Sequence, residues 1–135
     1  TFLINIPSDG QEHTATGACN TSEEQHLLAF LPMMRSRAVH QKVWVTVDTT
    51  TQTLYDEAFD WQHATYMMPG TPIDIPSGAK INTLCSYINN GGTTETYGES
   101  VNNESCFDAV YHYPISTAAN LFACAEGLSF DIARE

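Results

Sequence analysis

Short runs of alternating apolar and polar residues, separated by turn residues, constrain the fold most strongly. In residues 42–47, Val43, Val45 and Val47 recur at every second position, which places them on one face of an extended strand. Many short strands punctuated by Pro, Gly and Asn are typical of a β-sandwich or a barrel. The pattern predicts a first strand ending at residues 5–10, strands or strand-like segments at 42–47, 58–63, 65–68, 73–75, 81–88 and 106–113, and turns at 48–53, 76–78 and 89–92.

Two segments carry a helical signal instead. Residues 22–25, Ser-Glu-Glu-Gln, form a capping box before the apolar residues of 27–31, and this predicts a helix that ends before Pro32. Residues 117–123 favour a second helix, with Gly127 as its terminator. Helix propensity is a weak guide that tertiary context often overrides.

Length and charge limit the classes of partner. The 135 residues suffice for one domain with one core, and 16 acidic residues against 5 basic ones give a net charge of −11. Negative potential repels phosphate backbones and anionic lipid, so we expect neither nucleic acid nor a membrane surface as partner. No apolar run approaches the ~20 residues of a membrane-spanning helix. Because Thr1 opens the chain without a signal-like segment, we expect a processed or excised chain.

The four cysteines indicate an oxidising compartment. Cys19, Cys85, Cys106 and Cys124 form no C-x-x-C pair and no zinc-type cluster with histidine. An even number in a small chain rich in Thr and Asn predicts two disulfides, although spacing leaves all three connectivities open. Free buried thiols in a cytosolic domain are the alternative. Sequons begin at Asn20 and Asn103, but a chain of this composition produces such triplets by chance.

Local catalytic motifs are absent from the sequence. It contains no H-E-x-x-H, no P-loop, no G-x-G-x-x-G and no G-x-S-x-G, and its histidines are scattered. Two methionine pairs, Met33-Met34 and Met67-Met68, could offer soft thioether ligands to Cu(I), or one member of each pair could pack in the core. Three of the five cations, Arg35, Arg37 and Lys42, fall within eight residues and suggest a basic spot.

A longer pattern resembles a known family. Residues 82–87 contain a C-x-Y strand, residues 97–107 resemble a W/Y-G-E-x-T-x-x-E-M-C motif, and residues 111–114 end an aromatic strand in Tyr-Pro. Together they resemble the C-terminal half of the copper type II, ascorbate-dependent monooxygenases, which hydroxylate peptidylglycine and dopamine. Further similarity covers residues 59–62, 27–32 and 2–7 followed by Cys19, and so nearly the whole chain.

This resemblance implies a fold and a disulfide pairing. It implies a single domain over residues 1–135, built as an all-β, jelly-roll-like antiparallel β-sandwich in place of the two local helices. It also implies two disulfides, Cys85–Cys106 and Cys19–Cys124. The half of the family that carries a second copper is not represented in this sequence.

The positions that match the family's copper ligands have changed. In the family, two histidines of H-x-H and a methionine before the motif cysteine bind the catalytic copper. Met33, Arg35 and Ser105 occupy these positions here. A guanidinium cation opposes a copper ion, and a serine hydroxyl is a poor ligand for it.

Three hypotheses of function follow. The first is a non-catalytic module without a cofactor, secreted, on the cell surface or periplasmic, that binds a protein partner or assembles with itself. The second is a copper protein with a rebuilt site; as an enzyme it would use ascorbate and a second copper domain to hydroxylate a C–H bond. Candidate ligands for that site are Met33, Met34, His26, His40 and His112. The third is an acidic binder of a basic protein or of Ca²⁺.

Overall fold

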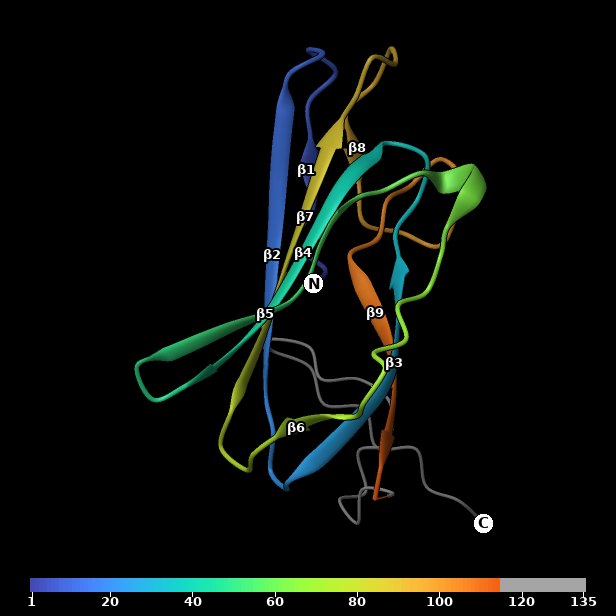
Figure 1. Cartoon of the computed structure of the whole chain (residues 1–135). Coiled ribbons are helices and arrows are strands. Elements are labelled where there is room, and N and C mark those ends of the chain that lie inside the picture. Colours follow the sequence, from blue (N-terminus) through green and yellow to red (C-terminus); the bar gives the residue numbers. More distant parts are fainter. Residues whose placement is uncertain (115–135) are drawn as a thin grey trace, which may run out of the picture.

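The computed structural model describes residues 1–114 and shows an all-β fold with antiparallel sheets packed together as a β-sandwich (Figure 1). This confirms the predicted fold class. The strands are β1 (Asn5–Ile6), β2 (Glu12–Asn20), β3 (Gln25–Met33), β4 (Ala38–Val47), β5 (Thr50–Ala58), β6 (Ile73–Ile75), β7 (Lys80–Ile88), β8 (Glu95–Thr96) and β9 (Phe107–Tyr113).

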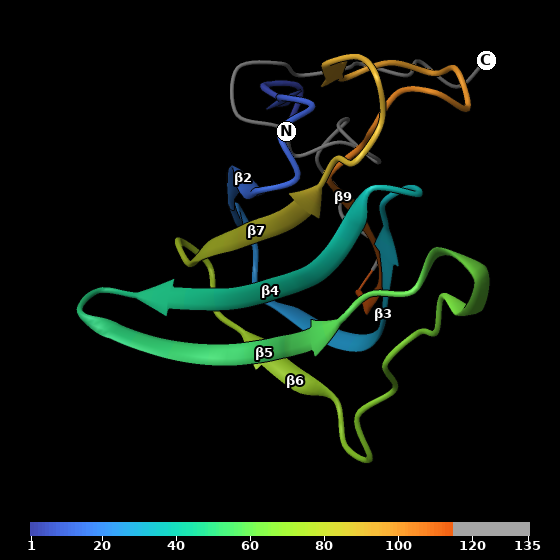
Figure 2. The same ribbon diagram turned by 90° about the horizontal axis from the view of Figure 1, so that it is seen from above.

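One layer is a four-stranded sheet with the order β2-β7-β4-β5. Strands β4 and β5 form a hairpin whose tip extends beyond the rest of the described chain (Figures 1 and 2). At this tip Asp48 adopts a positive φ of 53°, a conformation that tight hairpin turns require and that Asp tolerates better than most residues.

The other layer is a three-stranded sheet with the order β6-β3-β9. A register irregularity lies between Leu27 and Ala29, and after it the pairing runs regularly, with Ala29 opposite Tyr111 and Met33 opposite Phe107. Because side chains alternate along a strand, Ala29, Leu31 and Met33 share one face of this sheet. Strands β1 and β8 pair in a small separate sheet, and Ile6 of β1 packs in the core against β2 and β7.

The core lies between the two main sheets and contains two apolar clusters. In one, Leu27 and Phe30 of β3 pack with Val43 and Val45 of β4. Val47 packs against the same cluster, so the predicted apolar face of residues 42–47 is confirmed. The second cluster surrounds the Cys85 and Cys106 side chains.

The helix predicted before Pro32 is wrong, since this segment is strand β3. Burial of Leu27 and Phe30 against β4, together with backbone pairing to β6 and β9 on either side, outweighs the local helix propensity. The second predicted helix, at residues 117–123, lies outside the described residues.

Other parts of the strand prediction also differ from the structure. Strand β2 was not predicted, and the polar segment 48–53 enters strand β5 at Thr50. Strand β5 ends at Ala58, and Trp61–His63 forms a 3₁₀ turn that Asp60 caps by accepting a hydrogen bond from the Gln62 N–H. In 65–68 only Met67 pairs, in an isolated bridge to Phe30. No helix in residues 1–114 is long and apolar enough to cross a membrane.

The predicted turn at 89–92 is confirmed, and the Asn89 side chain holds it in place. This buried amide donates to the carbonyl oxygens of Ile6, at 3.1 Å, and Thr93, at 2.8 Å. Its oxygen accepts the Gly91 N–H at 2.9 Å. The turn is therefore anchored to β1, the strand that opens the chain.

Candidate functional site

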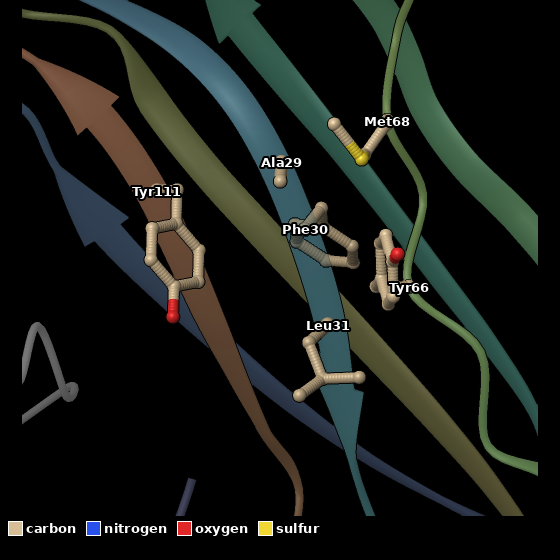
Figure 3. A pocket seen from close by; sticks show the side chains of 6 residues that line it. All are labelled: Ala29, Phe30, Leu31, Tyr66, Met68 and Tyr111. Carbon is tan, nitrogen blue, oxygen red and sulfur yellow. The ribbon is translucent and has the colours of Figure 1, made fainter.

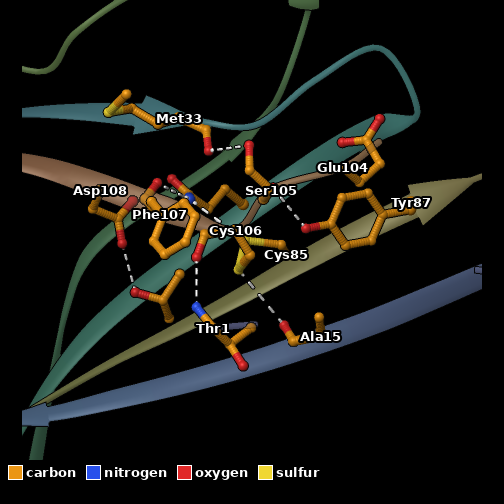
Figure 4. The surroundings of a disulfide bond; sticks show 12 residues. Thr1, Ala15, Met33, Cys85, Tyr87, Glu104, Ser105, Cys106, Phe107 and Asp108 are labelled. Atoms are coloured by element: carbon orange, nitrogen blue, oxygen red, sulfur yellow. Dashed lines mark hydrogen bonds between the residues drawn. A yellow bond between two sulfur atoms is a disulfide. The ribbon is translucent and has the colours of Figure 1, made fainter. Parts of the chain in front are cut away.

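The three positions that the resemblance aligns with copper ligands belong to one corner of the sandwich. Met33 ends β3, Arg35 follows it in the turn to β4, and Ser105 lies just before β9. The Ser105 hydroxyl donates a hydrogen bond of 3.1 Å to the Met33 carbonyl oxygen (Figure 4). The fold thus joins Met33 and Ser105, which are 72 positions apart in the sequence.

Backbone carbonyl groups hold the Arg35 guanidinium at this corner. Its Nη1 donates to the carbonyl oxygen of Glu99, at 3.1 Å, and to that of Ser100. The side chain therefore fastens the β3–β4 turn to the loop that leads to β9. A guanidinium offers only donors and a fixed positive charge, so it serves here as a structural tie and cannot coordinate a metal ion.

The Glu104 carboxylate holds the same β3–β4 turn through two hydrogen bonds. One carboxylate oxygen accepts the Arg35 N–H at 3.1 Å, and the other accepts the Arg37 N–H at 2.6 Å. Only 1% of Glu104 is exposed. Burial raises the pKa of this carboxyl, and the backbone hydrogen bonds counteract part of that increase. The sequence marked Glu104 only as part of a motif, because its hydrogen bonds come from backbone groups 67 and 69 positions away.

This arrangement does not fit a copper ion at the three positions. The Ser105 hydroxyl and the Arg35 guanidinium are engaged as donors to carbonyl groups, and Met33 retains only a thioether as a possible ligand. Copper sites in proteins combine several neutral or anionic donors at close range. The corner instead presents one soft donor beside a cation.

The five alternative copper ligands are distributed over different parts of the fold. His26 Nδ1 lies 2.6 Å from Asp74, and His40 Nε2 lies 2.9 Å from Asp56. His112 pairs with Leu27, near the start of β3, whereas Met33 is the last residue of that strand. Met34 packs in the core. Within residues 1–114, no three His, Cys, Asp or Glu side chains are placed to hold one metal ion.

Each methionine pair divides between core and surface. Met34 is buried while Met33 is 50% exposed, and Met67 packs against the core while Met68 is 66% exposed. The core-packing interpretation of the two pairs is therefore confirmed.

The predicted basic spot is not formed as a common surface, because each cation has its own acceptor. Arg35 contacts carbonyl groups, as described above. Arg37 Nη2 lies 3.9 Å from Glu95, and Lys42 Nζ lies 2.7 Å from Asp56. The hydrogen bond from Lys42 lowers the pKa of Asp56.

A disulfide between Cys85 and Cys106 joins β7 to the chain just before β9, and so links the two main sheets (Figure 4). This confirms the first pairing that the resemblance implied. The Tyr87 hydroxyl donates to the Ser105 carbonyl oxygen at 2.9 Å and holds the same segment. The implied Cys19–Cys124 pair involves Cys124, which lies outside the described residues.

Sequence reasoning missed a polar group buried between the sheets. Asp108 of β9 accepts a hydrogen bond of 2.6 Å from the Thr83 hydroxyl through one carboxylate oxygen. Its other oxygen and the Gln41 Oε1 atom are buried and have no hydrogen-bond partner within the described chain. Burial raises the pKa of Asp108 to about 6. Alternation along residues 106–113 could have placed Asp108 inward, on the same face as Val110.

An apolar groove of about 350 Å³ opens on the outer face of the three-stranded sheet. Ala29, Phe30 and Leu31 of β3 form its floor, with Tyr111 of β9 on one side and Tyr66 and Met68 on the other (Figure 3). These three flanking side chains are 65–68% exposed. No pattern in the sequence indicates the groove, because the segment 59–72 pairs with β3 through a single bridge.

The two ends of the groove differ in character. Met33 follows Leu31 on the same face of β3, so the corner of Met33, Arg35 and Ser105 lies beyond one end. Beyond the other end, His26 stacks on Tyr113 and contacts Asp74, with Glu24 at 3.9 Å. Both carboxylates are exposed. The groove itself is therefore lined by apolar and aromatic side chains, and the two carboxylates lie beyond its β6 end.

A scan against models of known protein families finds no match, and a search of curated proteins finds no similar sequence.

Proposed function

We propose that this chain is a non-catalytic binding module that keeps the β-sandwich scaffold of the copper type II monooxygenases. The single observation that supports this most is the corner of Met33, Arg35 and Ser105. Two of its three side chains are bonded to carbonyl groups of the chain itself, where the family would need metal ligands. Function resides in such sites rather than in the scaffold, so a fold can persist after its chemistry is lost.

The apolar groove supplies the binding surface in this proposal. Side chains of three exposed aromatic or thioether residues, Tyr66, Met68 and Tyr111, surround a floor that contains no charge. Rigid aromatic side chains beside a small cavity are common anchors at protein interfaces. The groove therefore suits one large apolar side chain of a partner.

Charge determines the kind of partner. The chain has a net charge of −11, and Arg35, Arg37 and Lys42 are each engaged within the molecule. Exposed Asp74 and Glu24 lie beyond one end of the groove. We infer that the partner is a basic protein segment, with an apolar anchor for the groove and Lys or Arg residues that meet the acidic end.

The disulfide supports the compartment in this proposal. A protein disulfide such as Cys85–Cys106 persists where the surroundings are oxidising. The proposal therefore places the module in a secreted, cell-surface or periplasmic setting.

The groove is tested with short synthetic peptides that carry Lys and Arg around one central Phe, Leu or Trp. We expect binding by titration calorimetry that weakens about tenfold or more in Tyr111→Ala, because the wall of the groove is lost. Val101→Ala is the matched control, since Val101 is also an exposed apolar residue but does not line the groove. Equal binding by both variants, or no binding by the unaltered chain, would contradict the assignment of the groove.

Ascorbate-driven, copper-dependent oxygen uptake by the purified chain would contradict the non-catalytic role itself.

A further inference from the structure

The two N-glycosylation sequons occupy opposite environments in the fold. The first is Asn20-Thr21-Ser22, at the end of β2, and the second is Asn103-Glu104-Ser105, in the loop before β9. Attachment of an oligosaccharide to a folded protein requires that the asparagine side chain project into solvent with room for a bulky sugar.

Asn20 meets this requirement. It is the last residue of β2, an edge strand of the four-stranded sheet, and it is exposed, as is Ser22. Ala15 of β2 is buried in the core, so by alternation Asn20 lies on the outer face of the sheet.

The residue between them fixes the backbone of this sequon. The Thr21 hydroxyl donates to the Pro76 carbonyl oxygen at 2.7 Å, and the Thr21 N–H donates to that of Ala79 at 2.9 Å. The buried middle residue thus holds Asn20 and Ser22 at the surface on either side.

Asn103 does not meet the requirement. Its side chain packs over Gly98, where even an added Cβ atom would overlap it. The next two residues are buried, and Glu104 supports the β3–β4 turn through its carboxylate. A sugar on Asn103 would separate this loop from the turn it supports.

We propose that Asn20 is an N-glycosylation site and that Asn103 is not. The donor is a polyprenyl diphosphate-linked oligosaccharide. The Asn20 Nδ2 forms a bond to the anomeric carbon of the first sugar and loses one proton. The bond from that carbon to the diphosphate breaks, and the diphosphate leaves with the electron pair.

The inference rests on the secreted route proposed above, and the test supplies that route separately. The chain is expressed through the secretory pathway of a eukaryotic cell, and intact mass is measured before and after digestion with peptide N-glycosidase. We expect one oligosaccharide per chain, with Asn20 converted to Asp on its removal. Because this route is imposed by the experiment, absence of glycan on secreted protein overturns the site whatever the natural compartment is.

Three variants identify the acceptor. Asn20→Gln and Ser22→Ala should each abolish the mass shift, and Ser22→Ala leaves the Asn20 side chain and the Ser22 carbonyl, which accepts from Ser77, unchanged. Asn103→Gln should retain the full shift. Glycan that persists in Asn20→Gln, or that is lost in Asn103→Gln, would overturn the assignment.

Discussion

Asp108 is a buried carboxyl whose protonation affects stability. Its pKa of about 6 in the folded chain exceeds the 3.8 of an unperturbed Asp, so the folded state binds this proton more tightly than the unfolded state. The contribution of protonated Asp108 to the free energy of unfolding is therefore fully present below about pH 4, and it is lost as the pH rises to about 6. Above that pH the buried charge costs up to about 3 kcal/mol of unfolding free energy.

We expect Asp108→Asn to raise the free energy of unfolding at pH 7.5 by about 1–3 kcal/mol, because the amide carries no charge and still accepts from the Thr83 hydroxyl. Urea denaturation at pH 7.5 and pH 4.5 measures the difference in free energy of unfolding. This difference should be smaller at pH 4.5, because Asp108 is then largely protonated and uncharged. Glu12→Gln, which removes a carboxylate at an exposed position, is the control. A loss of stability in Asp108→Asn at pH 7.5 would show that the buried charge is better compensated than its surroundings indicate.

Glu104 holds a turn through both of its carboxylate oxygens. Glu104→Gln leaves one acceptor and turns an amide N–H₂ toward a backbone N–H, so we expect a loss of about 1–3 kcal/mol in the free energy of unfolding. Thermal or urea denaturation measures it. Glu99→Gln removes a neighbouring carboxylate that is exposed, and it should have little effect. Equal losses in the two variants would mean that charge, rather than these two hydrogen bonds, matters at this corner.

At the level of strands, the sequence predicted those with regular alternation. Residues 42–47, 73–75 and 81–88 alternate or are bounded by turn residues, and they form β4, β6 and β7. Strands β2 and β5 were missed because their residues are largely polar and exposed, and pairing to a neighbour determines their conformation. The sequence of β3 predicted a helix because its local pattern does not include the pairing with β6 and β9 that determines its conformation.

The resemblance grouped Met33, Arg35 and Ser105, and their role as former copper-ligand positions stays a prediction. In the fold, the Ser105 hydroxyl contacts the Met33 carbonyl oxygen, and Arg35 lies in the turn that follows Met33. The groove could not be predicted, because its lining joins β3, β9 and an irregular segment that no periodic pattern describes. The two backbone N–H groups that donate to Glu104 could not be predicted either, because only the folded chain brings them close to its carboxylate.

A disulfide links β7 to the chain before β9, beside the hydrogen bond from Tyr87 to Ser105. Cys85 and Cys106 are 21 residues apart, and closing a loop of that size restricts the unfolded chain by about 3 kcal/mol. The double variant Cys85→Ala/Cys106→Ala should lose at least that much unfolding free energy, because two buried sulfur atoms also lose their packing. Urea denaturation measures the loss. A variant as stable as the unaltered chain would contradict the structural role of this link.

For the whole molecule, we propose that a monooxygenase scaffold is kept and that structural hydrogen bonds replace its metal site. The loss of one ligand alone could leave a weakened site. In this proposal a cation and a hydroxyl, both bonded to backbone carbonyl groups, occupy two of the three positions that the resemblance aligns with copper ligands, so we expect no partial copper site at this corner.

Copper titration tests this claim most directly. The oxidised chain is stripped with chelator and titrated with Cu(I) and Cu(II), beside the variant Met33→His/Arg35→His/Ser105→Met, whose folding is checked by circular dichroism. We predict that the unaltered chain binds no copper tightly and that the variant binds one equivalent, because the scaffold still positions three ligands at the corner. Tight binding of one equivalent by the unaltered chain would contradict the non-catalytic account, and a folded variant that binds none would contradict the inherited scaffold.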